Sequence, residues 1–214
     1  MYKTLIVTDL PRSAELDFNV ISLDQYLTDF PKIDEPKTRI INLCDTTKYL
    51  SRGYYCSLLA ESRQHSVLPS VNTINDIRNQ DAEESFGIRL PQGFLPKDIA
   101  IQQEPLVLKV YFGWTEEKAW RKAARSLFDR YSAPFLNASF HRDEDGLHIK
   151  LTNGDLKTLD QTEIKQFYER LKDFTERVWR NPVRRMNRWD MAILYNPDEQ
   201  NSPSDPEAIK RFVK

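Results

Sequence analysis

The chain is poor in the residues that build thiol and metal sites. Only two of its 214 residues are cysteines, Cys44 and Cys56, without a Cys-x-x-Cys pair or a histidine at the spacing of a metal partner. This pattern predicts two reduced, mostly buried thiols rather than a disulfide framework. The histidines are His65, His141 and His148, and the sequence joins none of them to a cysteine as a nucleophile and its base.

Glycine is scarce as well, with six residues in the whole chain. Neither a dinucleotide fingerprint nor a P-loop is present, because each needs several glycines at fixed spacing. The sequence also lacks the Gly-x-Ser-x-Gly elbow of serine hydrolases. No constellation of residues completes a catalytic site, so the sequence predicts a chain that is not catalytic by itself.

An excess of charge and long apolar runs are also missing. Lysine and arginine number 31 against 32 aspartates and glutamates, which gives a net charge of -1 and argues against a nucleic-acid partner. No apolar run approaches the roughly 18 residues that cross a bilayer, and the N-terminus does not resemble a secretory signal. We therefore expect a cytoplasmic protein without a membrane partner.

Residues 1–78 alternate between short buried strands and helices. Apolar, β-branched runs at 4–7, 18–23 and 38–44 predict strands. Serines precede the expected helices, with Ser22 or Asp24, Ser51, and Ser70 or Asn72 as the candidate N-caps. The pattern is typical of an α/β fold.

The rest of the chain divides into three parts. Residues 79–103 are polar, contain prolines and predict a linker. Residues 104–188 predict an inserted α+β module of order βαββα, with a helix capped by Thr115, a hairpin that turns at the solvated acidic loop 143–146, and an Arg-rich connector at its end. Residues 189–214 predict a returning strand and a helix, so we expect a split α/β portion formed by 1–78 and 189–214.

The loop after the third expected strand is the first candidate site. Open α/β sheets bind ligands at this edge, where the free N–H groups and the dipole of a helix favour anions. Lys48 and Arg52 would attract a substrate carboxylate or phosphate, Ser51 would order the helix, and Tyr49 and Tyr54 would wall the pocket. The alternative is that Ser51 caps, the tyrosines pack and the cations are solvated.

A second candidate is the Arg/Trp-rich segment 177–189, which carries five arginines, including Arg185 and Arg188, and two tryptophans. Guanidinium groups beside aromatic faces suit phosphates, carboxylates or exposed bases. A charged connector in which arginine stacks on tryptophan is the favoured alternative, given the net charge.

Three stretches of the chain together carry a family resemblance. They are Ile41-Asn42-Leu43-Cys44, then Tyr49 to His65 with its core Ser51-Arg52-Gly53-Tyr54-Tyr55, and then Leu68 to Asp76. With Val110-Tyr111-Phe112-Gly113 and Asp190 to Leu194, they resemble the RimK-like ATP-grasp N-terminal domain over nearly the whole chain. The resemblance implies a domain that precedes an ATP-grasp ligase, an enzyme that uses ATP and Mg²⁺ to form an acyl phosphate that an amine attacks.

Two hypotheses follow. The first is an accessory, substrate-recognition domain of an ATP-dependent carboxylate–amine ligase, which is inactive when isolated and holds no cofactor of its own. Its partners would be a C-terminal ATP-grasp domain, in the same or another chain, and an amino-acid or peptide substrate, and a homo-oligomer stays possible. The second is a non-enzymatic module that binds a peptide or a nucleic acid through residues 177–189. The residues predicted to bind substrate are Lys48, Tyr49, Ser51, Arg52, Tyr54, Arg185 and Arg188.

Overall fold

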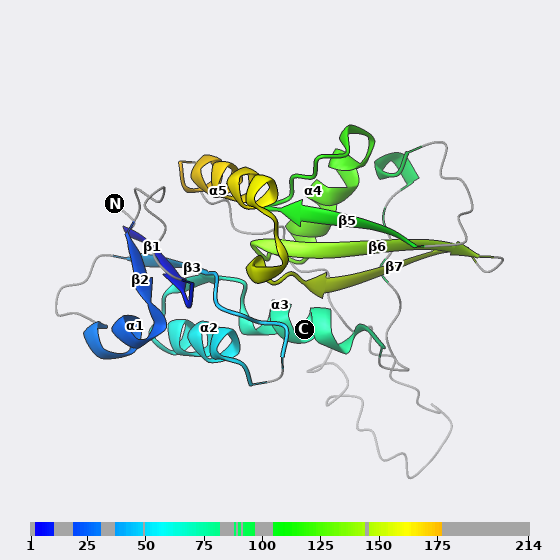
Figure 1. Cartoon of the computed structure of the whole chain (residues 1–214). Helices are drawn as coiled ribbons and strands as arrows, with labels where there is room; N and C mark the ends of the chain where they lie inside the picture. Colours follow the sequence, from blue (N-terminus) through cyan, green and yellow to red (C-terminus); the bar gives the residue numbers. More distant parts are fainter. Residues whose placement is uncertain are drawn as a thin grey trace, which may run out of the picture. The chain divides into compact units, whose positions relative to one another are not determined.

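The fold contains one parallel and one antiparallel sheet, with helices packed against both (Figure 1). The expected mixture of α and β structure is confirmed at this level. Within the part of the chain that is described, no helix has the length and apolar character needed to cross a bilayer. The computed structural model describes residues 3–10, 19–30, 37–48, 50–81, 88, 90, 92–96, 105–143 and 146–176, which all belong to one unit, residues 1–183.

The parallel sheet has the strand order β2-β1-β3-β4. Its strands are β1 (Lys3–Thr8), β2 (Val20–Ser22), β3 (Thr38–Asn42) and β4 (Ser66–Leu68). Each neighbouring pair is parallel, so the carboxyl ends of all four strands lie along one edge. The first three strands were expected from their apolar runs, and β4 was not.

Serine side chains start the three helices that accompany this sheet. The helices are α1 (Leu23–Asp29), α2 (Arg52–Ser62) and α3 (Val71–Arg78), with Ser22, Ser51 and Ser70 as N-caps. Each serine oxygen accepts the backbone N–H of the residue three positions on, which satisfies a donor that the helix leaves free. The serine alternatives among the predicted caps are therefore confirmed.

Alternate residues of β1 separate two hydrophobic cores. Leu5 and Val7 face a core shared with α1 and α2, and Figure 1 shows these two helices on the same side of the sheet. Ile6 faces the opposite way, into a core shared with Phe167 on α5 (Gln161–Thr175). The parallel sheet is thus buried on both faces, as its apolar strands require.

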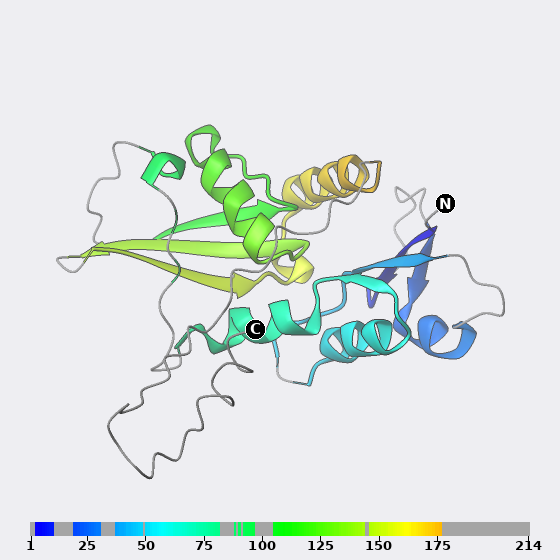
Figure 2. The ribbon, with the colours of Figure 1, turned by 180° about the vertical axis from the view of Figure 1, so that it is seen from behind.

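The second sheet has the order β5-β6-β7 and is antiparallel. Helix α4 lies across one of its faces (Figure 2), where Leu127 packs against Leu136 and Leu151 in a third core. The predicted order βαββα and the hairpin are observed, the hairpin closing at the pair Asp143 and Gly146. Its elements are β5 (Leu106–Tyr111), α4 (Arg121–Arg130), β6 (Phe135–Asp143), β7 (Gly146–Asn153) and α5.

The prediction that Thr115 caps the helix is wrong. Helix α4 begins at Arg121, after a 3-10 turn, η3 (Lys118–Trp120). Thr115 is buried, and its carbonyl accepts a hydrogen bond from Nε of Arg121 at 3.3 Å. Burial of Trp120 in the core sets the start of this helix, which a local capping pattern does not report. The remaining 3-10 turns are η1 (Asn79–Asp81), η2 (Gln92–Phe94) and η4 (Leu156–Thr158).

The expected domain boundaries stay predictions. Within the expected linker 79–103, the side chain of Ile88 is buried in the same core as α4. The expected strand and helix of 189–214 lie outside the described residues, as does the connector 177–188.

Candidate functional site

The carboxyl edge of the parallel sheet contains the point at which the strand order reverses. Strand β1 lies inside the sheet, with β2 on one side and β3 on the other, so the connections after β1 and β3 leave in opposite directions. Open α/β sheets bind small molecules in the crevice at such a point. Here the edge is formed by Asp9 after β1 and by Cys44 and Asp45 after β3.

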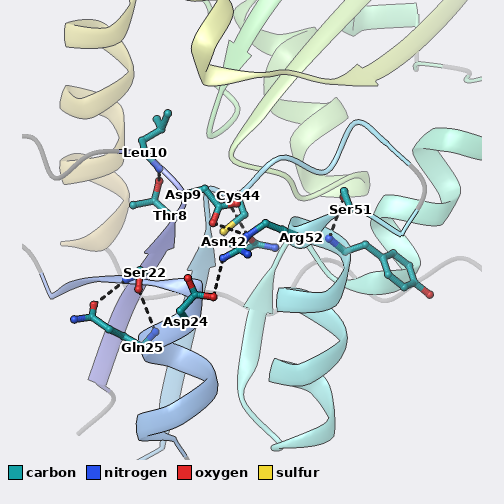
Figure 3. Close-up of polar contacts among 11 residues, drawn as sticks. Thr8, Asp9, Leu10, Ser22, Asp24, Gln25, Asn42, Cys44, Ser51 and Arg52 are labelled. Carbon is teal, nitrogen blue, oxygen red and sulfur yellow. Dashed lines mark hydrogen bonds and ion pairs between the residues drawn. The ribbon is translucent and has the colours of Figure 1, made fainter.

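Arg52, the first residue of α2, forms ion pairs with acidic residues that follow β1 and β2. Its Nε lies 3.1 Å from Oδ1 of Asp9, and its Nη2 lies 3.0 Å from Oδ1 of Asp24 (Figure 3). The hydrogen bonds to Asp24 and Asp9 raise the pKa of the guanidinium above its ordinary value. Since Asp9 follows β1 and Asp24 lies in the first turn of α1, directly after β2, Arg52 connects both segments to the start of α2.

We expect the replacement of Arg52 by glutamine to lower the free energy of unfolding by less than about 1 kcal/mol, because exposed ion pairs contribute little. The Arg52 side chain is 54% exposed, and those of Asp9 and Asp24 are 26% and 73% exposed. Urea denaturation of the variant checks this value. Arg125→Gln, which breaks an exposed pair with Asp129 at 3.0 Å, is the matched control. A loss above about 2 kcal/mol at Arg52 alone would contradict this expectation and give the pair a structural role.

A buried amide connects the end of β3 to α2. Asn42 is 2% exposed, and its Nδ2 donates to the carbonyl of Gly53 at 2.7 Å and to Oγ of Ser57 at 2.9 Å. Its Oδ1 accepts the backbone N–H of Cys44 at 3.0 Å. Ser57 in turn donates to the carbonyl of Pro69, which follows β4. The two polar residues therefore fix the loops after β3 and β4 with respect to α2.

The two cysteines are free and buried, as their spacing predicts. A hydrogen bond with Cys56 and burial raise the pKa of the Cys44 thiol, and the carboxylate of Asp9 adds to this effect. A thiol with a raised pKa stays protonated and is a poor nucleophile or metal ligand. Among the described residues, no group of three or more histidines, cysteines, aspartates or glutamates is arranged to hold a metal ion.

A small hollow lies beside this edge, between the parallel sheet and the antiparallel module. Its volume is about 30 Å³, far below the roughly 300–1,000 Å³ of drug-sized ligand sites. It has room for one group of about the size of a water molecule. Residues 42–46, 133–135 and 153–156 line it, together with Pro69 and Phe167.

The structure brings only part of the predicted set together. Arg52 and Ser51 lie at the carboxyl edge, Ser51 as the cap of α2, and Lys48 is exposed in the loop before it. Tyr54 is half-buried and its ring meets that of Tyr55 edge to face, with 5.9 Å between ring centroids. Whether any of them binds substrate stays a prediction. The other three, Tyr49, Arg185 and Arg188, lie outside the described residues, as does the whole segment 177–189.

Sequence reasoning missed the acidic partners at the edge. Asp9 and Asp24 pair with Arg52, and Asp45 accepts the N–H and the hydroxyl of Thr47 in the loop itself. Each aspartate follows an expected strand closely, which is a signal that the sequence does contain. Counted with Lys48 and Arg52, they leave the edge with more acidic than basic groups.

These observations define an α/β domain with a polar edge at the reversal point of a parallel sheet. The family model of the RimK-like ATPgrasp N-terminal domain matches residues 23–170, well over half of the chain. The chain belongs to this family, as its sequence motifs predict, and the match includes α2, strands β3 and β4, and the antiparallel sheet. No curated protein and no solved structure matches the chain.

Proposed function

We propose that the chain is the accessory, substrate-recognition domain of an ATP-dependent carboxylate–amine ligase. The family carries this proposal, because its description names the domain as the N-terminal part of a RimK-like ATP-grasp protein. In such a ligase the ATP-grasp domain would hold ATP and Mg²⁺ and form the acyl phosphate. This chain would present the amino-acid or peptide substrate in the cytoplasm, and the ATP-grasp domain would be its partner in the same or another chain.

The geometry of the carboxyl edge supports a role in recognition. Asp9, after β1, and Asp24, in the first turn of α1, meet there around Arg52, at the place where α/β sheets bind small molecules. The buried amide of Asn42 and the ion pairs hold these segments in place, and a preformed surface loses little entropy on binding. We propose Lys48 and Arg52 as the groups that attract the substrate carboxylate, with Ser51 and Tyr54 positioning the start of α2.

The proposal extends to the organisation of the chain. Residues 1–78 and 189–214 would form one α/β portion, and 104–188 would be inserted between its halves. The observed order β5, α4, β6, β7, α5 in the second region supports this division. Limited proteolysis that releases residues 104–188 as a folded fragment would support this division, and cleavage inside the antiparallel sheet would argue against it.

The test is ATP-dependent amide formation by the chain together with its ATP-grasp domain, measured as ADP release that requires both a carboxylate and an amine. We expect activity only when both domains are present. Lys48→Ala and Arg52→Ala should each raise the KM for the substrate about tenfold, the scale of one lost charge-assisted hydrogen bond.

Arg125→Ala is the matched control for these two variants, because it removes an exposed arginine of α4 that has no place at the edge. Its KM should equal that of the unaltered protein. Unchanged KM values for Lys48→Ala and Arg52→Ala would show that the edge does not bind substrate. Amide formation at full rate by the ATP-grasp domain without this chain would contradict the proposed function.

A further inference from the structure

We propose that His141 and His148 bind a divalent transition-metal ion between them, on the face of the antiparallel sheet opposite α4. The ion is one that imidazole nitrogen suits, such as Zn²⁺, Ni²⁺ or Cu²⁺. The pair supplies fewer than the three protein ligands of a catalytic zinc site, so water completes the coordination and the ion exchanges with solution. The inference is independent of the proposed function, because it uses no residue of the carboxyl edge.

The first argument is the register of the hairpin. His141 of β6 stands directly opposite His148 of β7, two residue pairs from the turn-closing pair Asp143 and Gly146. Directly opposed residues have Cβ atoms about 4.5–5.5 Å apart and side chains on the same face. Rings that start this close can converge on one ion, which lies about 2.0–2.1 Å from each nitrogen. The chain has three histidines, and the fold places two of them in one cross-strand pair.

The second argument is that solvent reaches this pair. Phe140 and Ile149 are buried in the core with α4, which lies across their face of the sheet (Figure 2). Because side chains alternate along a strand, His141 and His148 point to the opposite face. Helix α5 packs near Phe135 at the start of β6, six residues from His141, which is about 20 Å at the rise of a strand. His148 is exposed and His141 is half-buried.

The third argument is that burial selects one ring nitrogen of His141. Its Nδ1 is buried, so an ion binds this ring through Nε2. Nδ1 also has no hydrogen-bond partner among the described residues. No hydrogen bond therefore fixes the tautomer, and the neutral ring can carry its proton on Nδ1 and offer the lone pair of Nε2 to a metal. Half-burial restricts the ring, and a ligand that is already ordered loses less entropy on binding.

The charge of the surroundings determines which ions bind. Lys150 lies two residues beyond His148 on the same face and is exposed. Its ammonium group repels every cation, so binding depends on the bonds to nitrogen and not on charge. Calcium and magnesium prefer oxygen ligands. We therefore expect the pair to bind Zn²⁺ and Ni²⁺ and to leave Mg²⁺ and Ca²⁺ in solution.

The experiment uses the chain of 214 residues and ZnCl₂ as the probe, with NMR of the histidine rings as the measurement. We expect the signals of His141 and His148 to move together, with one dissociation constant and one ion per chain. NiCl₂ should broaden the same signals, and MgCl₂ should change neither. His65, whose Nδ1 lies 2.7 Å from the hydroxyl oxygen of Tyr26, is the control within the same molecule and should not respond. Separate dissociation constants for the two rings, or an equal response of His65, would overturn the proposal.

Variants test whether one ion joins the two strands. His141→Gln and His148→Gln should each weaken zinc binding about tenfold or more, since even the loss of a partner behind a metal ligand costs about 10–100-fold. The double variant should lose little more, because both single variants already break the same chelate. Lys150→Gln removes the neighbouring cation and no ligand, so it is the matched control and should bind zinc at least as tightly as the unaltered chain. Single variants that bind as the unaltered chain does would show that the ion does not bridge the pair.

A gain of affinity excludes misfolding as the explanation. Ser139 precedes His141 by two residues, on the same strand and the same face, and stands opposite Lys150. Ser139→His therefore adds a third imidazole beside the pair, and we expect zinc binding to strengthen about tenfold or more. No gain in this variant would contradict the proposed position of the ion.

Discussion

Phe167→Ala is expected to lower the free energy of unfolding by about 3–5 kcal/mol, the range for a phenylalanine removed from a packed core. The side chain of Phe167 is fully buried. Its ring lies 5.7 Å from that of Tyr111 and 5.5 Å from that of Phe112, measured between centroids. The same core includes Ile6 and Ile41 of the parallel sheet. One side chain of α5 therefore joins both sheets, and its loss leaves a cavity between them.

Urea denaturation followed by tryptophan fluorescence measures this effect. Phe94→Ala is the control for ring removal, because Phe94 is 37% exposed, and we expect a loss below about 1 kcal/mol. Phe167→Leu should lose less than the alanine variant because it fills most of the cavity. If Phe167→Ala unfolded with the midpoint of the unaltered protein, the two sheets would not depend on this core.

Local signals in the sequence were sufficient to predict most of the strands and helices of the parallel-sheet region. The runs around Leu5 and Ile40 predicted buried strands, and Ser22, Ser51 and Ser70 predicted helix starts, because capping depends on residues only three positions apart. The hairpin between β6 and β7 was predictable for the same reason, since its turn closes over four residues. These features require no knowledge of distant segments.

Features that depend on distant contacts were not predictable. Strand β4 has three residues, too few for a period of two to show, and it exists because Ile41 of β3 pairs with Leu68. The start of α4 is set by the burial of Trp120 and not by the polar Thr115. In both cases tertiary packing decides where an element begins.

The candidate site shows the same contrast between features set by local sequence and features set by distant contacts. The sequence located the edge and identified Ser51 and Arg52 there, but it did not reveal the acidic partners of Arg52. Arg52 pairs with Asp9, 43 positions earlier, and with Asp24, 28 positions earlier, and its role in substrate binding stays a prediction. Only the strand order β2-β1-β3 brings these three side chains together.

Gly53→Ala is expected to lower the free energy of unfolding by about 3 kcal/mol. A Cβ at this position would lie 2.4 Å from the carbonyl oxygen of Asp45 and 2.7 Å from that of Cys44. Alanine would gain about 1 kcal/mol as the better helix former, but the clash is with backbone, which cannot swing away as a flexible side chain can. The loop after β3 must move, and the hydrogen bond from the N–H of Gly53 to Asp45 is then lost.

Gly93→Ala is the matched control, because a Cβ there would meet nothing within 4 Å, and we expect a change within about 0.5 kcal/mol. Backbone NMR shifts around Asp45 should move in the Gly53 variant and not in the control. Equal stability of the two variants would show that the loop does not rest on α2. The single glycine of this segment is too little for a phosphate-binding loop, yet close approach of helix and strand is one task that glycines perform in such loops. Gly53 performs this task alone, and it thereby places Asp45 in the wall of the hollow.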